Sequence, residues 1–224
     1  MIIGHRGAAA VAPENTLSAI SRAIEIGVDA VEVDVRMTKD QKVVVIHDEA
    51  VDRTTNGTGR VGKLHLHEIK RLDAGRGECV PTLEEVFDFV GNRVRIFVEL
   101  KEGKTEEAVV ELIRAHQLFD TTVVISFWHR LVRRVKELDR RVRTGVLMVG
   151  CPADAAVAFA ARADCFMMKY TFVDKAFVDV AHRNGLQVFI WNIDEGHLAQ
   201  PYAAMGVDGI GSNDPQTLVS LFRS

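Results

Sequence analysis

Short runs rich in valine and isoleucine alternate along the chain with longer segments whose apolar residues recur about every 3.6 positions. The short runs predict eight strands, at residues 2–4, 30–34, 95–99, 122–126, 143–147, 165–168, 187–191 and 207–211. The longer segments predict helices, among them 16–26, 83–90, 106–117, 131–138, 174–184 and 216–222. Strand–helix alternation implies a parallel sheet with right-handed crossovers, and eight such units predict a closed α/β barrel of the TIM (β/α)8 type.

Residues that start and stop helices stand at the ends of these segments. Thr82 precedes a helical pattern and has Glu85 three positions later, which is the arrangement of a capping box. Asp214 followed by Pro215 predicts a cap and a first helical residue. Gly27 stands where a helix should end. These signals agree with the helices predicted from periodicity.

One segment interrupts the alternation. Roughly 45 residues, at 36–80, separate the second predicted strand from the next helix, whereas a βα loop usually has about 2–6 residues. The segment begins with a hairpin-like piece at 36–48 and continues into a stretch rich in glycine and threonine at 53–62. Because the chain contains no linker-like stretch, we expect one domain over residues 1–224, with a short insertion after the second strand at approximately 49–80.

Composition and charge exclude several classes of partner. The 224-residue chain has 28 Lys and Arg against 31 Asp and Glu, a net charge of −3, which argues against nucleic-acid binding. Its apolar runs fall short of the ~20 residues of a membrane helix, and His5 and Arg6 interrupt the first run too early for a signal peptide. Its three cysteines fit neither a disulfide framework nor a zinc site. We therefore expect a cytoplasmic protein without membrane insertion.

Two acidic residues interrupt the second predicted strand, which reads Val31-Glu32-Val33-Asp34-Val35. Side chains alternate across a strand, so the valines should face the helices and the two acids the barrel interior. Burying neighbouring carboxylates is costly unless a cation lies between them. The alternative is an exposed edge strand with one polar face, but the other predicted strands have the apolar character of a buried sheet.

A further acid and a lysine stand at the end of the third predicted strand. The same alternation directs Glu99 and Lys101 inward at the C-terminal end, where barrel active sites are built. Glu32, Asp34 and Glu99 thus form a candidate site for one divalent cation, and oxygen-only ligands favour Mg²⁺ or Ca²⁺ over zinc. Lys101 supplies positive charge that such a site needs before it can accept an anion.

Two histidines also follow strand-like runs, His5 after the first and His47 after residues 43–46. The guanidinium fork of the adjacent Arg6 suits phosphate oxygens, and Gly7 would let the backbone approach a ligand closely. A metal site, two cations and two imidazoles suit the cleavage of a phosphodiester, in which one histidine acts as base and the other as acid.

Taken together, the motifs resemble the glycerophosphodiester phosphodiesterase family, nearly from end to end of the chain. They are His5-Arg6-Gly7, Pro13-Glu14-Asn15-Thr16, Glu32-Val33-Asp34, His47-Asp48, Asp52-Arg53-Thr54-Thr55-Asn56-Gly57-Thr58-Gly59, Leu72-Asp73-Ala74-Gly75, Pro81-Thr82-Leu83-Glu84-Glu85, Val98-Glu99-Leu100-Lys101, Ser126-Phe127, Trp191 and Gly206-Val207-Asp208-Gly209-Ile210. The resemblance implies a metal-dependent barrel hydrolase that converts deacylated phospholipids, such as glycerophosphocholine or glycerophosphoethanolamine, into sn-glycerol 3-phosphate and an alcohol. The long segment after the second strand resembles the family's insertion.

On the matching positions, the resemblance implies a role for each polar residue. The metal would be bound by Glu32, Asp34 and Glu99, the catalytic acid–base pair would be His5 and His47, and the phosphate would be held by Arg6 and Lys101. The resemblance leaves open which histidine is the acid. It also leaves open whether water attacks directly or the glycerol hydroxyl first forms a cyclic phosphate.

Five further residues are candidates for lining the pocket of this small-molecule substrate: Glu14, Asn15, Phe127, Lys169 and Trp191. Most of them also have a structural interpretation. Asn15 could cap the first helix, the two aromatic side chains could be ordinary core residues, and Lys169 could be a solvated residue at the rim.

Two other functions are alternatives. A cyclising phosphodiesterase related to bacterial phosphoinositide or sphingomyelin lipases would share the barrel, but the sequence indicates neither an exposed aromatic cluster nor a polybasic stretch. A non-catalytic ligand-binding barrel would be expected to lack part of the polar set.

Asn192 and residues 211–213 depart from the common family pattern, which should affect substrate fit rather than chemistry because these positions are not expected to contact the catalytic groups.

Overall fold

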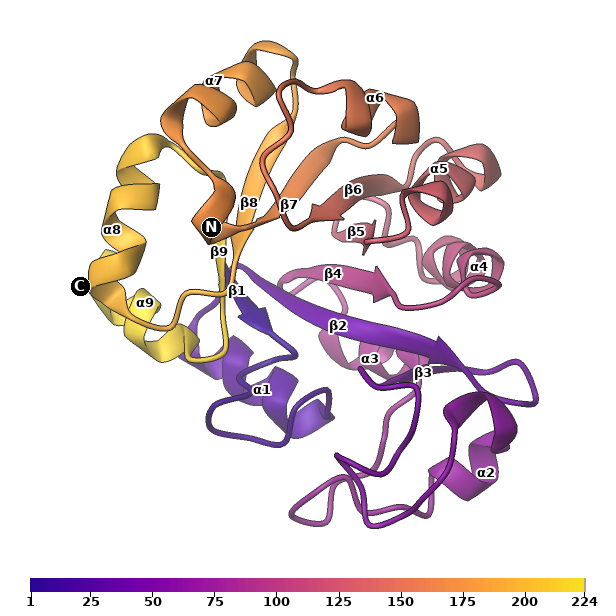
Figure 1. Ribbon diagram of the computed structural model, residues 1–224. Coiled ribbons are helices and arrows are strands. Elements are labelled where there is room, and N and C mark those ends of the chain that lie inside the picture. Colours follow the sequence, from indigo (N-terminus) through magenta and orange to yellow (C-terminus); the bar gives the residue numbers. More distant parts are fainter. Residues whose placement is uncertain (224) are drawn as a thin grey trace.

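The computed structural model describes residues 1–223 and shows a ring of parallel strands surrounded by helices (Figure 1). Among these residues, eight strands pair in the order β1-β2-β4-β5-β6-β7-β8-β9, and β9 pairs with β1 to close the barrel. They are β1 (Ile2–His5), β2 (Ala30–Met37), β4 (Arg95–Leu100), β5 (Thr122–Ser126), β6 (Arg143–Met148), β7 (Cys165–Lys169), β8 (Gln187–Trp191) and β9 (Gly209–Ser212). The predicted TIM (β/α)8 barrel is confirmed, and each predicted strand overlaps one of these.

Helices between the strands cover the outside of the barrel. They are α1 (Leu17–Ile26), α3 (Leu83–Val90), α4 (Glu106–His116), α5 (His129–Leu138), α6 (Ala156–Ala161), α7 (Lys175–Arg183), α8 (Gly196–Met205) and α9 (Pro215–Arg223). The apolar spacing does not single out α6, which is too short to set a period, or α8, which contains Gly196 and Pro201. Within residues 1–223, no helix combines the length and apolar character needed to cross a bilayer.

The predicted helix ends are present. Thr82 accepts a hydrogen bond from the Glu85 backbone N–H at 3.1 Å, and the Glu85 carboxylate accepts one from the Thr82 N–H at 2.8 Å. Gly27 ends α1 in the left-handed region, with φ of 95°. At the start of α1 the cap is Thr16, whose hydroxyl accepts from the Ala19 N–H at 3.2 Å. Asn15 is therefore free for another role.

The alternation of side chains along the strands separates two apolar layers. Val31 and Val33 on β2 are buried between the sheet and the helices. A second cluster fills the barrel interior, where the rings of Phe97 and Phe189 meet edge to face with centroids 5.2 Å apart. Further along β2 and β4, toward the C-terminal ends of these strands, the side chains that point into the barrel are acidic. The start of the barrel is thus packed with apolar side chains, and polar side chains gather toward its C-terminal end.

The segment after β2 forms a small unit beside the barrel, at the lower right of Figure 1. Strand β2 extends to Met37 because its last residues pair antiparallel with β3 (Val43–Val45), which confirms the hairpin-like piece. A 3₁₀ turn (Val61–Lys63) and helix α2 (Leu66–Ile69) follow. Buried side chains of this segment, among them Ile46 and Ile69, form a cluster separate from the barrel core. This packing holds the loops of the insertion in place.

Candidate active site

A cavity of about 270 Å³ lies at the C-terminal ends of the barrel strands. One side is polar and is formed by His5, Arg6, Glu32, His47, Glu99 and Lys101. The other side is mainly apolar and includes Ile3, Ile125, Phe127, Leu147, Met167 and Trp191. The cavity therefore offers charged groups next to an apolar wall, an arrangement that suits a small anion with an organic substituent.

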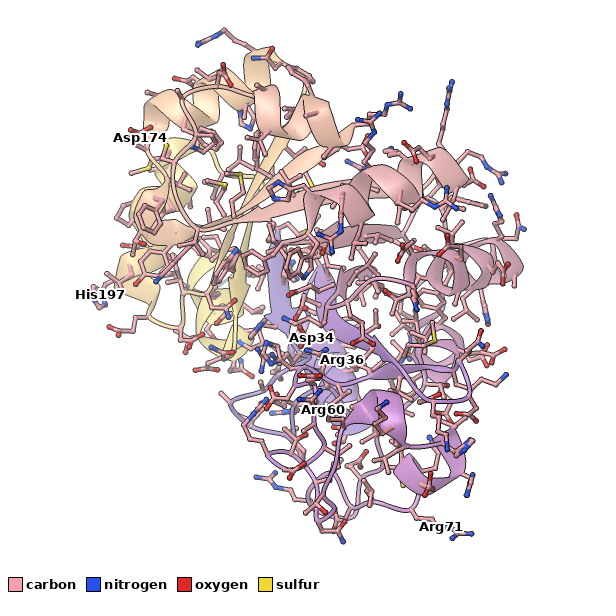
Figure 2. The ribbon with its side chains drawn as sticks, turned by 45° about the vertical axis from the view of Figure 1, so that its right-hand side comes forward. Asp34, Arg36, Arg60, Arg71, Asp174 and His197 are labelled. Atoms are coloured by element: carbon pink, nitrogen blue, oxygen red, sulfur yellow. The ribbon has the colours of Figure 1, made fainter. Side chains whose placement is uncertain are left out.

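Three carboxylates from neighbouring strands converge on the polar side. Strand register places Asp34 on β2 directly beside Glu99 on β4, and Glu32 beside His5 on β1. Glu32, Asp34 and Glu99 each offer an oxygen atom, and these oxygens lie within 4.8 Å of one another. The side chains are buried, with Asp34 at 0% exposure; Figure 2 shows it inside the molecule, whereas Arg71 lies at the outer edge of the insertion. The inward direction predicted for these acids is confirmed.

The carboxylate cluster fits a hard divalent cation. Glu32 Oε1 and Asp34 Oδ1 are buried and have no hydrogen-bond partner within the described part of the chain. Buried polar atoms are almost always hydrogen-bonded. Glu32 Oε1 has no such bond, and Asp34 Oδ1 has only an ion-pair contact with Lys101 at 3.4 Å, so the cluster can accept a further positive partner. Carboxylate oxygens are the ligands that Mg²⁺ and Ca²⁺ prefer.

Burial and the neighbouring charges shift the pKa values of the acids in this cluster. Burial, followed by the charges of Asp34 and Glu99, raises the pKa of Glu32 well above its usual value. Burial and then the Asp34 charge raise the pKa of Glu99 to about 7. Burial also opposes ionisation of Asp34, but Lys101 and then Arg6 outweigh it and lower the pKa of Asp34. Asp34 is therefore the acid that remains most readily ionised.

Two cations border the acids. The backbone N–H of Arg6, whose φ of 52° is left-handed, donates to Glu32 Oε2 at 3.0 Å. The Arg6 guanidinium donates to Glu14 at 2.8 Å, and its Nε lies 3.2 Å from Asp34 Oδ2. Lys101 Nζ donates to Glu99 Oε1 at 2.7 Å and lies 3.4 Å from Asp34 Oδ1. The proposed phosphate-binding side chains thus lie in the cavity wall and are held by the carboxylates.

Replacing Glu99 with Gln should relieve this repulsion, so we expect the metal-free variant to unfold at an equal or higher temperature than wild type at pH 8. An acid whose folded-state pKa is raised binds more protons when folded than when unfolded, so stability falls as pH rises from about 4.5 to about 7. The variant lacks this titration, and its thermal midpoint should fall less between pH 5 and pH 8.

The same variant should bind Mg²⁺ at least about tenfold more weakly, as measured by calorimetry, because a neutral amide replaces one of the three negatively charged ligands. Thermal unfolding of both proteins in EDTA provides the comparison. A large loss of metal-free stability in Glu99→Gln at pH 8 would contradict the repulsion argument.

His47 is held at two points. Its ring Nδ1 lies 2.6 Å from Asp48 Oδ1, and its backbone carbonyl accepts a hydrogen bond from Arg36 Nε at 2.9 Å. Hydrogen bonds, from Arg53 first and His47 second, lower the pKa of Asp48, so this carboxylate is ionised beside the imidazole. An ionised acceptor at Nδ1 fixes the ring and leaves Nε2 for other contacts.

Arg53 connects the insertion to the barrel. Its guanidinium donates to Asp48 Oδ2 at 2.6 Å and to Glu14 Oε1 at 2.7 Å. Although burial acts in the opposite direction, Arg53 and Arg6 lower the pKa of Glu14 to about 2. Arg53 belongs to one of the motifs that carry the family resemblance, but the sequence assigns it no role. Its place beside two acids comes from the packing of the insertion, which residue spacing does not reveal.

We expect Arg53→Gln to lower kcat about tenfold, because it releases Asp48 and with it the His47 ring. The side chain of Arg53 is 47% exposed, so the free energy of unfolding should change by less than about 1 kcal/mol. A matched control is Arg60→Gln, since Arg60 also lies in the insertion and pairs with Glu49. Equal kcat values for the two variants would show that Arg53 does not position His47.

The His5 ring contacts two asparagines, contrary to the expectation that the departing positions stay away from the catalytic groups. His5 Nδ1 lies 2.7 Å from Asn213 Oδ1 and 3.0 Å from Asn192 Nδ2. Closure of the barrel pairs β9 with β1, and β8 pairs with β9, so the residues that follow these two strands reach the ring. Burial, and then the Arg6 charge, lower the pKa of His5.

The remaining candidates lie in different places. Phe127 and Trp191 line the cavity with ring centroids 5.8 Å apart, edge to face. Asn15 does not cap α1; its amide donates to Asp34 Oδ2 at 2.8 Å and accepts from the Asp34 N–H at 3.2 Å. Glu14 and Lys169, at the end of β7, are not among the cavity-lining residues.

Two expectations about the surroundings of the site need correction. Gly7 allows close approach to helix α1 rather than to a ligand, because a Cβ atom there would lie 2.5 Å from the Ala19 carbonyl carbon. An exposed aromatic pair also exists at the mouth: Phe127 is 43% exposed and Trp128, which stacks under Arg130, is 50% exposed. The sequence does not reveal this pair because strand-end aromatics are usually buried.

Comparison with known proteins places these features in a family. Residues 5–217 match the model of the "Glycerophosphoryl diester phosphodiesterase family". A glycerophosphodiester phosphodiesterase of Caldanaerobacter subterraneus subsp. tengcongensis is 37% identical over 238 residues, covering 100% of this chain and 98% of the relative. An Oleispira antarctica phosphodiesterase solved with the product sn-glycerol-3-phosphate has a TM-score of 0.95, 28% identity and coverage of 100% and 97%. A glycerophosphodiester phosphodiesterase structure from Thermotoga maritima has a TM-score of 0.84, 27% identity and coverage of 98% and 97%.

Proposed function

This chain belongs to the glycerophosphoryl diester phosphodiesterase family, and from that membership we propose that it hydrolyses glycerophosphodiesters to sn-glycerol 3-phosphate and an alcohol. Glycerophosphocholine and glycerophosphoethanolamine are the proposed substrates. The observation that carries the proposal is a cavity lined by two cations, two histidines and two acids, Glu32 and Glu99, which cluster with the buried Asp34.

Glu32, Asp34 and Glu99 would hold one divalent cation, Mg²⁺ or Ca²⁺. When bound, such an ion acts as a Lewis acid and stabilises negative charge on the phosphoryl oxygens. The three carboxylates outnumber the charges of Arg6 and Lys101 by one. A divalent ion would reverse that balance to one net positive charge, which suits a phosphodiester monoanion.

The side chains of the chain itself would orient the substrate and move its protons. Arg6 and Lys101 would bind non-bridging phosphate oxygens from the polar side of the cavity. His5 is the last residue of β1 and His47 lies just after β3, and both line the cavity. One would remove a proton from the attacking hydroxyl and the other would donate a proton to the leaving oxygen, as in-line displacement requires. The attacking group would be water or the free glycerol hydroxyl.

The apolar wall would hold one substituent of the diester. Phe127 and Trp191 present aromatic faces and edges, and the Trp191 ring is fixed by its N–H, which donates to the Met167 carbonyl at 3.1 Å. A fixed wall orients the substituent relative to the phosphate without requiring a charged partner.

A coupled assay for released glycerol 3-phosphate tests this proposal. The panel contains glycerophosphocholine, glycerophosphoethanolamine, glycerophosphoinositol and intact phospholipids, each with Mg²⁺ or Ca²⁺. We expect release from the water-soluble diesters. The exposed Phe127–Trp128 pair favours the alternative of a lipid-cleaving enzyme, which would act on the intact lipids instead. No turnover of any substrate with either ion would favour a non-catalytic barrel.

A further inference from the structure

His5 is attached to a chain of hydrogen bonds that leads away from the cavity. The Asn213 amide oxygen lies 2.7 Å from His5 Nδ1, and the Asn213 amide nitrogen donates to Asp194 Oδ2 at 2.9 Å. Asp194 follows β8 and Asn213 follows β9, so the hydrogen-bond chain runs from β1 across the ends of the next two strands of the barrel. His47 has a carboxylate directly at its Nδ1, whereas His5 reaches a carboxylate through an amide.

Asp194 fixes the orientation of the Asn213 amide. A carboxylate only accepts hydrogen bonds, so the amide nitrogen must face Asp194 and the amide oxygen must face His5. Asp194 is itself held by the Ser212 hydroxyl at 2.9 Å and by the Asn213 backbone N–H at 2.7 Å. Although burial opposes this effect, these donors lower the pKa of Asp194, which keeps it an acceptor.

The second amide at Nδ1 does not compete with this arrangement. One ring nitrogen cannot donate to Asn213 Oδ1 while it accepts from Asn192 Nδ2, so the two contacts exclude each other. The Asn213 contact is shorter and is anchored at both ends. Asn192 Oδ1 is buried and unpaired within residues 1–223, and a half-turn of this amide would place its oxygen at Nδ1 instead.

We propose that Asp194 and Asn213 are positioning residues that hold the proton of the neutral His5 ring on Nδ1. Nε2, the nitrogen that lies 3.8 Å from Glu32 Oε2, is then the one that gains and loses a proton during the reaction. This inference rests on the proposed function for its effect on turnover. The tautomer itself is a property of the folded chain, and it can be measured whether or not the chain hydrolyses a diester.

The first test is nitrogen-15 NMR of the full chain with Mg²⁺ present, with the His5 signals assigned by their absence in His5→Gln. We expect the Nδ1–H tautomer in wild type. The double variant Asn192→Leu with Asn213→Leu removes both amides at Nδ1 with side chains of similar size. In this variant we expect a mixture of tautomers and a fall in kcat of at least about tenfold.

Two further variants separate positioning from a general effect on structure. The double swap Asp194→Asn with Asn213→Asp keeps an oxygen acceptor at Nδ1 and a donor–acceptor pair behind it, so it should restore the tautomer and most of kcat. The control is Asn184→Leu, which changes an exposed asparagine at the end of α7 that donates to the Val180 carbonyl. It should leave both the His5 tautomer and kcat unchanged.

A wild-type His5 protonated on Nε2 would overturn the inference, as would a double variant Asn192→Leu with Asn213→Leu that keeps the wild-type tautomer and kcat. A wild type that shows the Nδ1–H tautomer but no diesterase activity would instead contradict the proposed function.

Discussion

Removing divalent cations should stop glycerophosphodiester hydrolysis, and adding either Mg²⁺ or Ca²⁺ should restore it. Lewis-acid stabilisation supplies several kcal/mol to a phosphoryl transfer, and ~1.4 kcal/mol corresponds to a factor of ten in rate. We therefore expect a loss of at least about a thousandfold in kcat/KM after exhaustive chelation.

The electrostatics of the site give the physical reason for this large effect. Glu32 Oε1 and Asp34 Oδ1 have no hydrogen-bond partner among residues 1–223, and burial, followed by the charges of neighbouring acids, raises the pKa values of Glu32 and Glu99. A metal ion must displace any proton on these acids, so its binding should release protons and should weaken as pH falls below about 7. Without the ion, a phosphodiester anion would meet the carboxylates directly.

The measurement combines turnover with metal content after dialysis against EDTA. Glu106→Gln is a suitable control, because Glu106 is a buried carboxylate on helix α4 outside the cavity and should leave the metal titration unchanged. Full activity in protein shown to be free of metal would count decisively against a cation at the carboxylate cluster.

The fold was predictable because its signals are local. The opposite directions of the Glu32 side chain and of its neighbours Val31 and Val33 follow from the geometry of a strand. The Thr82 capping box depends only on residues within one helical turn. Convergence of the acids then followed from one tertiary assumption, that β2 and β4 are neighbours, since register alone brings Asp34 beside Glu99.

The partners of the two histidines were not predictable in the same way. Asn213 reaches His5 across 208 positions of sequence, through the pairing of β1 with β9 that closes the barrel. Arg53 reaches Glu14 only because the insertion packs against the barrel mouth. A short polar side chain can bond many neighbours, and its sequence position does not select among them. Asn15 illustrates this: the cap it could form is made by Thr16, and Asn15 bonds Asp34.

His47→Ala should lower kcat by at least about a hundredfold, because general acid–base catalysis by a positioned side chain contributes about 10²–10⁴. Two contacts hold His47 in place, because Asp48 binds its Nδ1 and Arg36 binds its backbone carbonyl, and Arg53 in turn secures Asp48. Substrate binding depends more on Arg6 and Lys101, so KM should change much less than kcat. Figure 2 shows His197, the proposed control, at the outer edge of the molecule.

His197→Ala should keep wild-type turnover because its side chain is 73% exposed and pairs only with Glu195 among the described residues. His5→Ala should resemble His47→Ala, since each ring would handle one of the two protons of the reaction. The double variant should then lose little beyond the more damaging single variant, because groups that act in one transition state are not additive. Near-normal kcat in His47→Ala, with the fold intact by thermal unfolding, would show that another group transfers this proton.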